Sequence, residues 1–427
     1  MTKMTMNTLS RRAALRAGAA AAAAPALLPA AARAADSIKI GFVTPQTGPL
    51  AGFGEPTDYV LAAVRDAVAK GVNVGGQTYA VEILVRDSQS SASRAADVAA
   101  ELINTENVDL LLGIATPDTT NPVADQAEAN QVPCLTTVAP WQSYFFGRKG
   151  DPAKGFTWTY HFFWGLEDIE ATYQALWNSV STNKVVGGLF PNDADGNAWG
   201  NAGFGFPGVL PKQGYKVVDT GRYEDLASDF TSQITAFKAA NADIVTGVVI
   251  PPDFATFWTQ AGQQGFKPKV VTIAKALLFP SAVAALGARG DGLSSEIWWS
   301  PEHPFKSGLT GQSSKALAAA YTATTGREWT QPLGYVHAIF ELAIDALKRA
   351  KSKSSTDILA AITTTDYKSI VGPISWAHGP VKNVCKTPLV GGQWRSTPGG
   401  PYHYRLVITE VGSVPNFVAE SNMQPIG

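Results

Sequence analysis

The sequence contains few of the residues that build metal and redox sites. Among its 427 residues there are two cysteines, Cys134 and Cys385, and five histidines. Neither residue type shows the spacing of a zinc site, and the sequence has no G-x-S-x-G, H-E-x-x-H or P-loop pattern. We therefore expect no bound metal, no cofactor and no enzymatic activity.

The two cysteines leave their redox state open. An oxidising compartment would allow Cys134 and Cys385 to form a disulfide. Cys134, however, lies in the apolar run VPCLTT, which favours a small buried thiol. Because the sequence does not fix the Cα separation that a bridge requires, both states remain possible.

The first 34 residues have the pattern of an export signal. A basic start with the pair Arg11-Arg12 precedes an alanine-rich run at 17–32 and an A-x-A cleavage pattern at 32–34. The arginine pair resembles a twin-arginine signal, but Ala14 replaces the usual bulky residue, so twin-arginine and general export both stay open. The run is shorter than the ~20 residues of a membrane span, and no cysteine follows it to carry a lipid. We predict cleavage near Ala34 and a periplasmic protein.

The chain has no excess of positive charge once this segment is removed. The segment holds five of the 34 Lys and Arg residues, so 29 basic residues remain against 35 acidic ones, a net charge of −6. This argues against nucleic-acid binding, which would require a basic patch. The remaining chain of about 390 residues is long enough for two domains of ordinary size.

Short β-branched runs alternate with segments of helical periodicity. The predicted strands are 39–44, 80–86, 109–114, 132–137, 184–190, 215–219, 243–250 and 269–274. The predicted helices are 55–70, 93–105, 121–130, 168–181, 228–240 and 253–265. This alternation is typical of parallel sheets covered by helices on both faces, and the strands are too many for one sheet of usual size. We predict an α/β protein with two doubly wound, Rossmann-like lobes.

Two further segments bear on the search for a site. Apolar residues repeat along 335–350, which predicts an amphipathic helix with His337 off the apolar stripe and in solvent. DADGN (193–197) begins like a calcium loop, but Ala198 and Phe204 stand where the loop needs a glycine and an acid. We interpret this segment as a surface turn that caps the next helix.

The densest aromatic segment is WTYHFFWG (158–165). Alternate side chains of a strand face opposite sides, so Trp158, Tyr160, Phe162 and Trp164 would share one face. Two interpretations follow: the strand is buried on both sides, or its larger face is a wall against which a flat or apolar ligand binds.

Four segments, taken in order, point to a family. They are IKIGFVTPQTGPLAGFGEP (38–56), DLLLGIATPDTTNPVADQAEANQVPCLTT (109–137), LFPNDADGNAWG (189–200) and VGPISW (371–376). Together they resemble the extracytoplasmic solute-binding proteins of branched-chain amino-acid ABC importers. The resemblance implies the periplasmic binding protein type I fold, in which three crossovers join two lobes around a ligand cleft. It implies one lobe from 35–160 with 300–372 and another from 161–299 with 373–427, with WTYHFFWG at the first crossover.

The resemblance also implies a set of ligand-binding residues. The expected set is Thr116, Thr119, Val138, Trp141, His161, Phe162, Trp164, Trp199 and Lys275. Lys275 stands where the amino-acid binders have a glutamate that holds the ligand's ammonium group, so an anion without a free amine is favoured. The alternative is that Lys275 points to solvent or pairs with a nearby acid. With the aromatic residues, Lys275 points to an aromatic or otherwise bulky hydrophobic carboxylate.

The resemblance implies capture of a small organic ligand by a monomer, which delivers it to an inner-membrane ABC permease complex. The alternative in the same fold is a binder of branched-chain or other amino acids, with the ammonium group held by Glu167 or Asp168. A secreted enzyme would need a nucleophile–base pair or a metal set, and a sensor ectodomain would need a second membrane segment. The sequence shows neither feature.

Overall fold

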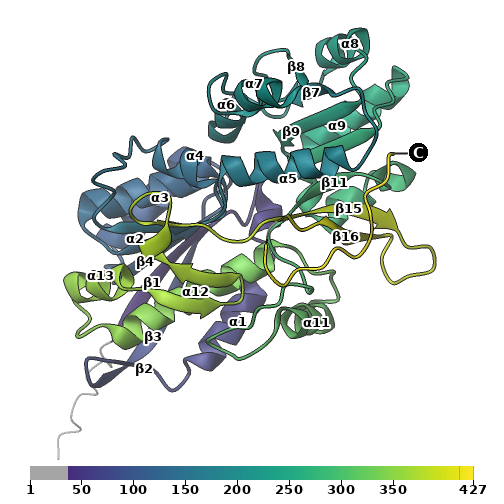
Figure 1. Cartoon of the computed structure of the whole chain (residues 1–427). Helices are drawn as coiled ribbons and strands as arrows, with labels where there is room; N and C mark the ends of the chain where they lie inside the picture. The colour runs from purple at the N-terminus through teal and green to yellow at the C-terminus, as the bar shows by residue number, and fades with distance from the viewer. Residues whose placement is uncertain (1–36, 413, 427) are drawn as a thin grey trace, which may run out of the picture. The chain divides into compact units, whose positions relative to one another are not determined.

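Two seven-stranded sheets form the framework of the computed structural model, which describes residues 37–412 and 414–426 (Figure 1). The predicted export signal lies outside these residues. The helices are α1 (Thr57–Ala67), α2 (Ala92–Asn104), α3 (Thr116–Asn130), α4 (Trp141–Phe145), α5 (Leu166–Asn178), α6 (Ala194–Trp199), α7 (Phe206–Val209), α8 (Thr231–Ala239), α9 (Pro251–Gln263), α10 (Pro280–Ala284), α11 (Ser314–Thr325), α12 (Pro332–Arg349) and α13 (Ser355–Thr363). A separate hairpin pairs β12 (Asp366–Ser369) with β13 (Gly372–Ser375).

The first sheet is parallel except at one edge. Its strand order is β14 (Val384–Cys385), β6 (Thr159–Phe162), β5 (Cys134–Thr137), β4 (Leu110–Ile114), β1 (Ser37–Thr44), β3 (Gln77–Asp87) and β2 (Val72–Val74). Only the terminal pair, β2 with β3, is antiparallel. Buried residues of α2 and α3 pack on one face, and those of α1, α12 and α13 pack on the other. Both faces are therefore covered, as the continuous apolar runs of the central strands require.

The second sheet combines a parallel part with an antiparallel edge. Its order is β16 (Tyr404–Glu410), β15 (Val390–Ser396), β11 (Ser294–Ile297), β10 (Val270–Lys275), β9 (Ile244–Val249), β7 (Val185–Leu189) and β8 (Lys216–Asp219). Strands β11, β15 and β16 pair antiparallel. Helices α8, α9 and α10 cover one face, and α5 and α7 cover the other. The prediction of two doubly wound lobes is confirmed.

The chain passes between the two sheets three times. It leaves the first sheet after β6, returns after β11, and leaves again between β14 and β15. The last passage lies at residues 386–389, later than the boundary at 372/373 that the sequence suggested. The reason is β14, a two-residue strand that pairs with β6 in the first sheet and is too short to be seen from periodicity.

All the predicted strands and helices are present, with shifted ends. The largest shift is in α3, which begins at Thr116 instead of residue 121. Pro117 does not prevent this earlier start, because proline fits the first turn of a helix, where the missing N–H has no intrahelical partner.

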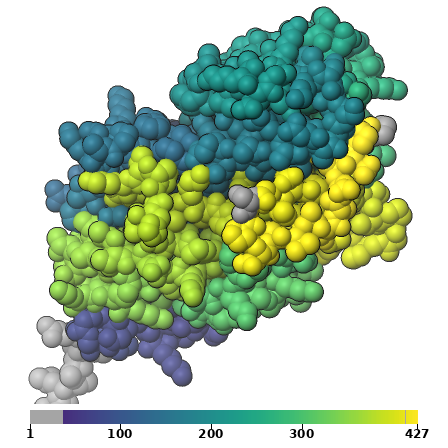
Figure 2. Space-filling model, viewed as in Figure 1, coloured from purple at the N-terminus to yellow at the C-terminus, as the bar shows by residue number. Residues whose placement is uncertain are grey.

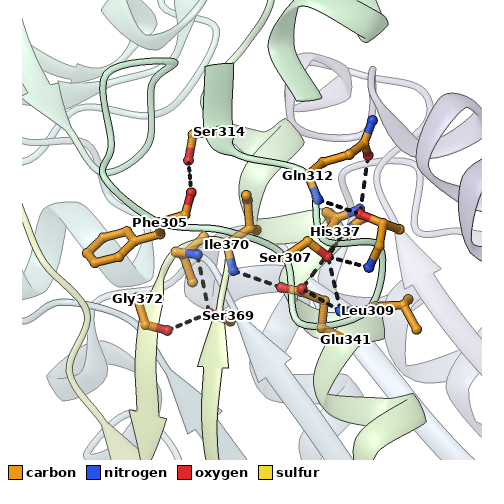
Figure 3. A network of polar contacts seen from close by, with 12 residues as sticks. Phe305, Ser307, Leu309, Gln312, Ser314, His337, Glu341, Ser369, Ile370 and Gly372 are labelled. Carbon is orange, nitrogen blue, oxygen red and sulfur yellow. Dashed lines mark hydrogen bonds and ion pairs between the residues drawn. The ribbon is translucent and has the colours of Figure 1, made fainter. Parts of the chain in front are cut away.

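The prediction for His337 is wrong, because this side chain is fully buried. Helix α12 packs on nearly all sides and has only a short solvent-facing part, so its apolar stripe does not mark an exposed face. His337 Nε2 lies 2.9 Å from Ser307 Oγ, and Glu341 Oε2 accepts a hydrogen bond from the Ile370 N–H at 2.9 Å (Figure 3). This network ties α12 to the chain that follows β11 and to the β12–β13 turn.

Both cysteines are buried and free, which leaves the thiol as the observed state. Cys134 is on β5 and Cys385 is on β14, and β6 runs between these two strands. Neighbouring strands lie about 4.8 Å apart, so two strand spacings exceed the reach of a disulfide. Burial raises the pKa of the Cys134 thiol to about 12.

The C-terminal strands pack beside α5. Residues of α5 and residues 387–414 line one surface pocket together, and Figure 2 shows the yellow C-terminal segment against the blue atoms of this region. Within the described residues, no helix is both long and apolar enough to cross a membrane.

Candidate functional site

A small, partly open cavity of about 30 Å3 lies among the connections of both sheets. Its lining comes from segments that follow β1, β4, β5 and β6 of the first sheet and from the ends of β7, β9, β10 and β11 of the second. The carboxyl ends of parallel strands are where doubly wound proteins bind ligands. The lining residues are Phe53, Thr116, Val138, Pro140, Phe163, Trp164, Asp195, Trp199, Val248, Ala274, Lys275, Leu278, Glu296 and Trp298.

Aromatic side chains form much of the cavity wall. The ring centroid of Phe163 lies 4.6 Å from that of Trp164 and 5.4 Å from that of Trp298. Tyr335 packs edge-on against Phe163 at 5.1 Å and against Trp298 at 4.9 Å. Trp199 of α6 adds a further wall from the second lobe. Such fixed rings offer a rigid apolar surface that suits a flat ligand.

Five lining residues each have one buried polar atom without a hydrogen-bond partner in the part of the chain that the structure describes. These atoms, which we call the unpartnered set, are Thr116 Oγ1, Trp164 Nε1, Trp199 Nε1, Trp298 Nε1 and Asp195 Oδ1. Buried polar groups are nearly always hydrogen-bonded, and each exception calls for an explanation. Their gathering around one cavity indicates a site completed by a bound molecule.

The start of α3 brings a helix N-terminus to the cavity. The turn between β4 and α3 holds Ala115 at φ 77° and Thr116 at φ 55°, and the neighbouring Val138 lies at φ 65°. The Thr116 N–H donates to the Val138 carbonyl at 2.9 Å, which ties the two turns together. Positive φ is costly for β-branched residues, and such strain is found mainly at ligand sites. The partial positive charge of the helix N-terminus favours an anion here.

Lys275 lines the cavity but is already paired. Its Nζ lies 2.7 Å from Asp193 Oδ2 and 3.0 Å from Asp195 Oδ2, and its side chain is 6% exposed. Burial alone would lower the pKa of Lys275, but Asp193, Asp195 and Asp118 raise it above its ordinary value. The lysine is therefore a cation whose charge is satisfied within the protein. The alternative stated from the sequence, pairing with a nearby acid, is the observed one.

The carboxylates around Lys275 outnumber it. Burial raises the pKa of Asp195 to about 7, against the lowering effect of Lys275. Asp118 of α3 has a raised pKa because of burial and of Asp193, and its Oδ1 accepts a hydrogen bond from the Ala194 N–H at 3.3 Å. This bond joins the first lobe to the second beside the cavity.

DADGN (193–197) has the predicted capping role but not the predicted surface position. The Asp193 carboxylate accepts a hydrogen bond from the Gly196 N–H at the start of α6, as expected of a cap. Asp195, however, is buried and lines the cavity. The sequence could not show this, because its partner Lys275 is far away along the chain.

The cavity also contains residues that the sequence did not suggest. Glu296 of β11 accepts hydrogen bonds on Oε2 from Tyr173 OH at 2.6 Å and from Ser295 Oγ at 2.8 Å. Burial raises the pKa of Glu296 to about 7. Phe53 and Trp298 also line the cavity. Phe163 lines it too, as expected from its place at the cleft end of the aromatic segment 158–165.

Of the nine expected ligand-binding residues, the structure brings five to the cavity. They are Thr116, Val138, Trp164, Trp199 and Lys275. They follow or end five different strands, β4, β5, β6, β7 and β10, whose ends fold together, as the resemblance implies.

The other four expected residues lie outside the cavity lining and have other partners. The Thr119 hydroxyl donates to the Ala115 carbonyl, and Trp141 Nε1 donates to Glu167 Oε1 at 3.1 Å. Phe162 is fully buried and stacks on Tyr335 at 6.1 Å. For these three residues the structure gives a packing or capping role.

His161 is the fourth of these residues, and it is part of the first-lobe core. Its Nε2 lies 2.8 Å from the Ala139 carbonyl, its Nδ1 lies 2.9 Å from Thr136 Oγ1, and its ring stacks on Tyr144 at 4.1 Å. Burial, with a smaller effect of Arg148, lowers the pKa of His161 to about 3. The imidazole is neutral and fully engaged.

Glu167 and Asp168, considered as alternative partners for an ammonium group, are engaged elsewhere. Lys386, on the third crossover, has its Nζ 2.8 Å from Glu167 Oε1 and 2.6 Å from Asp168 Oδ1. Both acids stand at the start of α5, outside the cavity lining. They link the first crossover to the third.

Comparison with known proteins agrees with this architecture. A family model described as a periplasmic binding protein matches residues 37–396. A leucine-binding protein from Thermotoga maritima is 20% identical with a TM-score of 0.68, over 87% of this chain and 98% of that one. An ABC-transporter solute-binding protein from R. palustris, in complex with 4-hydroxybenzoate, is 19% identical with a TM-score of 0.70, over 91% and 98%. A second one, from Rhodopseudomonas palustris BisB5 with 3,4-dihydroxybenzoic acid, is 19% identical with a TM-score of 0.69, over 89% and 99%. At these identities the structural likeness establishes the fold.

Proposed function

Because the chain belongs to the periplasmic binding protein family, we propose that it is the substrate-binding component of an ABC import system for a small aromatic or hydrophobic carboxylate. The ligand binds in the cavity between the lobes and is then delivered to the permease. The protein acts in the periplasm as a monomer, after removal of its export signal, and carries out no chemical reaction on the ligand.

The composition of the cavity carries this proposal. Rings of Phe163, Trp164, Trp199 and Trp298 supply apolar walls, and the unpartnered set supplies hydrogen-bonding groups among them. A ligand pocket has this general form, with mostly apolar walls and a few polar groups that fix the orientation. Two of the solved structures of similar fold contain hydroxylated benzoic acids, which are ligands of this kind.

The carboxylate of the ligand fits best at the start of α3. Thr116 Oγ1 is an unpartnered hydroxyl at that helix N-terminus. Lys275 contributes only a screened positive charge, since Asp193 and Asp195 lie within 3.0 Å of its Nζ. The anion is therefore held by donors and by the helix dipole, and an ion pair with the lysine is not required.

The surplus of acids favours a second candidate, an amino acid. Asp118, Asp193 and Asp195 surround the single cation Lys275, and this excess of negative charge would attract the ligand's ammonium group. One protein of similar fold is a leucine-binding protein. The two candidates differ in whether the ligand supplies a cation, and this can be tested directly.

Thermal unfolding of the purified full-length chain in the presence of ligands distinguishes the candidates. The panel is benzoate, 3- and 4-hydroxybenzoate, 3,4-dihydroxybenzoate, phenylalanine, leucine and isoleucine. A ligand at 100 times its Kd adds about 2.7 kcal/mol of stability. We expect an aromatic acid to raise the Tm and leucine and isoleucine to leave it unchanged. The opposite pattern would establish the amino-acid candidate.

A pair of tryptophan variants tests whether the cavity is the binding site. Trp298 lines the cavity, whereas Trp329 packs against Trp299 and lies outside the lining. We expect Trp298→Leu to lose the ligand-induced rise in Tm and Trp329→Leu to keep it. Equal loss in both variants would contradict binding in this cavity.

A further inference from the structure

The unpartnered set contains more donors than acceptors. Three of its members are indole N–H groups, which donate and cannot accept. Thr116 Oγ1 can do both. Only Asp195 Oδ1, when ionised, is purely an acceptor. The unpartnered set is therefore complementary to a ligand with several hydrogen-bond acceptors and at least one donor.

The ratio of donors to acceptors in the unpartnered set distinguishes a ligand with an ammonium group from a ligand with a hydroxyl group. An ammonium group brings three N–H donors and needs about three acceptors, whereas a hydroxyl brings one donor and accepts as well. The four possible donors of the set match the oxygens of a carboxylate and of a hydroxyl. Its single carboxylate oxygen matches one hydroxyl hydrogen. A hydroxylated acid thus satisfies the unpartnered set more fully than an amino acid does.

Asp195 is held so that one oxygen remains for the ligand. It lies in the first turn of α6, and its Oδ2 is 3.0 Å from Lys275 Nζ. Asp193, the cap of the same helix, also holds Lys275, at 2.7 Å. The Asp195 side chain is 3% exposed, and its Oδ1 has no partner among residues 37–412 and 414–426. Because Lys275 holds Oδ2, Oδ1 is the oxygen of this cavity-lining carboxylate that is left for a ligand.

We propose that Asp195 determines specificity, and that its Oδ1 accepts a hydrogen bond from a hydroxyl on the ring of the bound acid. This inference rests on the proposed function of the cavity and deepens it, since it names the ligand class as hydroxylated aromatic acids. A ligand without the hydroxyl leaves a buried carboxylate oxygen unpaired. Sites built to hydrogen-bond a hydroxyl discriminate strongly against analogues that lack it.

Isothermal titration calorimetry with benzoate and with 3- and 4-hydroxybenzoate tests the inference on the full chain. We expect the wild type to bind at least one hydroxybenzoate roughly 10- to 100-fold more tightly than benzoate, as for a hydrogen bond to a charged group. In Asp195→Ala this preference falls to less than about threefold, while the affinity for benzoate stays within about threefold of the wild type.

Asp193→Asn is the matched control. Asp193 pairs with the same lysine but lies outside the cavity lining, and asparagine caps a helix as well as aspartate. We expect this variant to keep the preference for the hydroxybenzoate. Should Asp195→Ala fail to fold, Asp195→Asn keeps the volume, removes the charge and should reduce the preference at least threefold.

Three outcomes would overturn the role of Asp195. They are equal affinity of the wild type for benzoate and the hydroxybenzoates, an unchanged preference in the Asp195 variants, and an equal loss of both ligands in Asp195→Ala. The first of these leaves the proposed function standing, because benzoate still binds. If the wild type binds none of these acids but binds leucine, the proposed ligand class fails together with the inference.

Discussion

Two cationic side chains among the described residues, Arg148 and Lys275, are buried, and their surroundings differ. Arg148, in the first lobe, is 1% exposed and has its Nε 2.7 Å from Asp125 Oδ1. Its Nη1 donates to Tyr144 OH at 2.6 Å and to Thr159 Oγ1 at 2.9 Å. Its guanidinium lies 3.9 Å from the ring centroid of Phe156. We call this group the Arg148 centre.

We use the name Lys275 centre for Lys275 together with Asp118, Asp193 and Asp195. This centre has three carboxylates for one cation, and it borders the cavity. At the Arg148 centre, rings and hydroxyls fill the space around the cation. At the Lys275 centre, the neighbouring groups include the unpartnered set. Burial of a charge therefore does not by itself mark a site. A site is marked by several unpartnered polar groups that line one cavity, because a single unpartnered atom, Nη2 of Arg148, also occurs at the Arg148 centre.

The largest expected effect comes from removing the lysine. Lys275→Met leaves three carboxylates without their cation, and breaking a buried ion pair in this way costs about 3–5 kcal/mol. We expect the free energy of unfolding in urea at pH 7.5 to fall by this amount. Adding Asp195→Asn should restore a large part, since it removes one of the stranded charges.

Arg148→Met is the corresponding substitution at the Arg148 centre. It removes packing and hydrogen bonds at a filled centre, so we expect a loss of roughly 3 kcal/mol. Adding Asp195→Asn should leave this loss unchanged, because the two sites share no partner. If Asp195→Asn rescued both variants equally, the two centres would not differ in the way described.

The next prediction concerns pH. His161, beside the Arg148 centre, has a folded pKa of about 3, below its ordinary value of 6.5. Its contribution to stability is therefore full above pH 6.5 and is lost as the pH falls toward 3. At pH 5 the loss is about 2 kcal/mol. His161→Gln keeps a donor and an acceptor but does not titrate, so its urea stability should fall less between pH 7 and pH 5.

The Lys275 centre should respond in the opposite direction. Asp195 has a folded pKa of about 7, above its ordinary value of 3.8, so its contribution is present at low pH and is lost as the pH rises through 7. We expect Asp195→Asn to reduce the loss of stability between pH 4 and pH 7. His161→Gln should make the rise of stability with pH smaller, and Asp195→Asn should make the fall of stability with pH smaller. If both substitutions changed the slope of stability against pH in the same direction, the assignment of these two residues would be contradicted.

The smallest effects come from two threonines, and they separate stability from binding. Thr116→Val removes an unpartnered hydroxyl of the cavity, so stability should change by less than about 0.5 kcal/mol while affinity for the aromatic acid falls roughly tenfold. Thr159→Val removes a hydroxyl that bonds Arg148 and Glu128, so stability should fall by about 1 kcal/mol with unchanged affinity. Urea unfolding and calorimetry on both variants make the comparison.

The sequence predicted the framework because the signal for each strand is local. The run 109–114 is rich in leucine and the run 243–250 is rich in β-branched residues, and they became β4 and β9. The misplaced lobe boundary came from β14, which is only two residues long. The error at His337 came from a helix that is buried almost all round, for which an apolar stripe does not identify the exposed face.

The site was predicted only in part, because its electrostatics depend on contacts distant in sequence. Lys275 is close to its partners Asp193 and Asp195 only after β7 and β10 have joined one sheet. Nothing near Lys275 in the sequence shows that it is neutralised. His161 and Phe162 were expected at the cavity because they belong to the aromatic segment, but β6 ends at Phe162 and the cavity begins at Phe163.

The path of the chain between the two sheets constrains how the protein folds during synthesis. The first sheet takes its edge strand from residues 384–385, and the second takes two strands from residues 390–410. Neither lobe is complete on the ribosome until nearly the whole chain has emerged, so the lobes cannot mature one after the other as consecutive domains do. A truncation before residue 384 removes strands from both sheets at once, and its damage would not be confined to one half of the molecule.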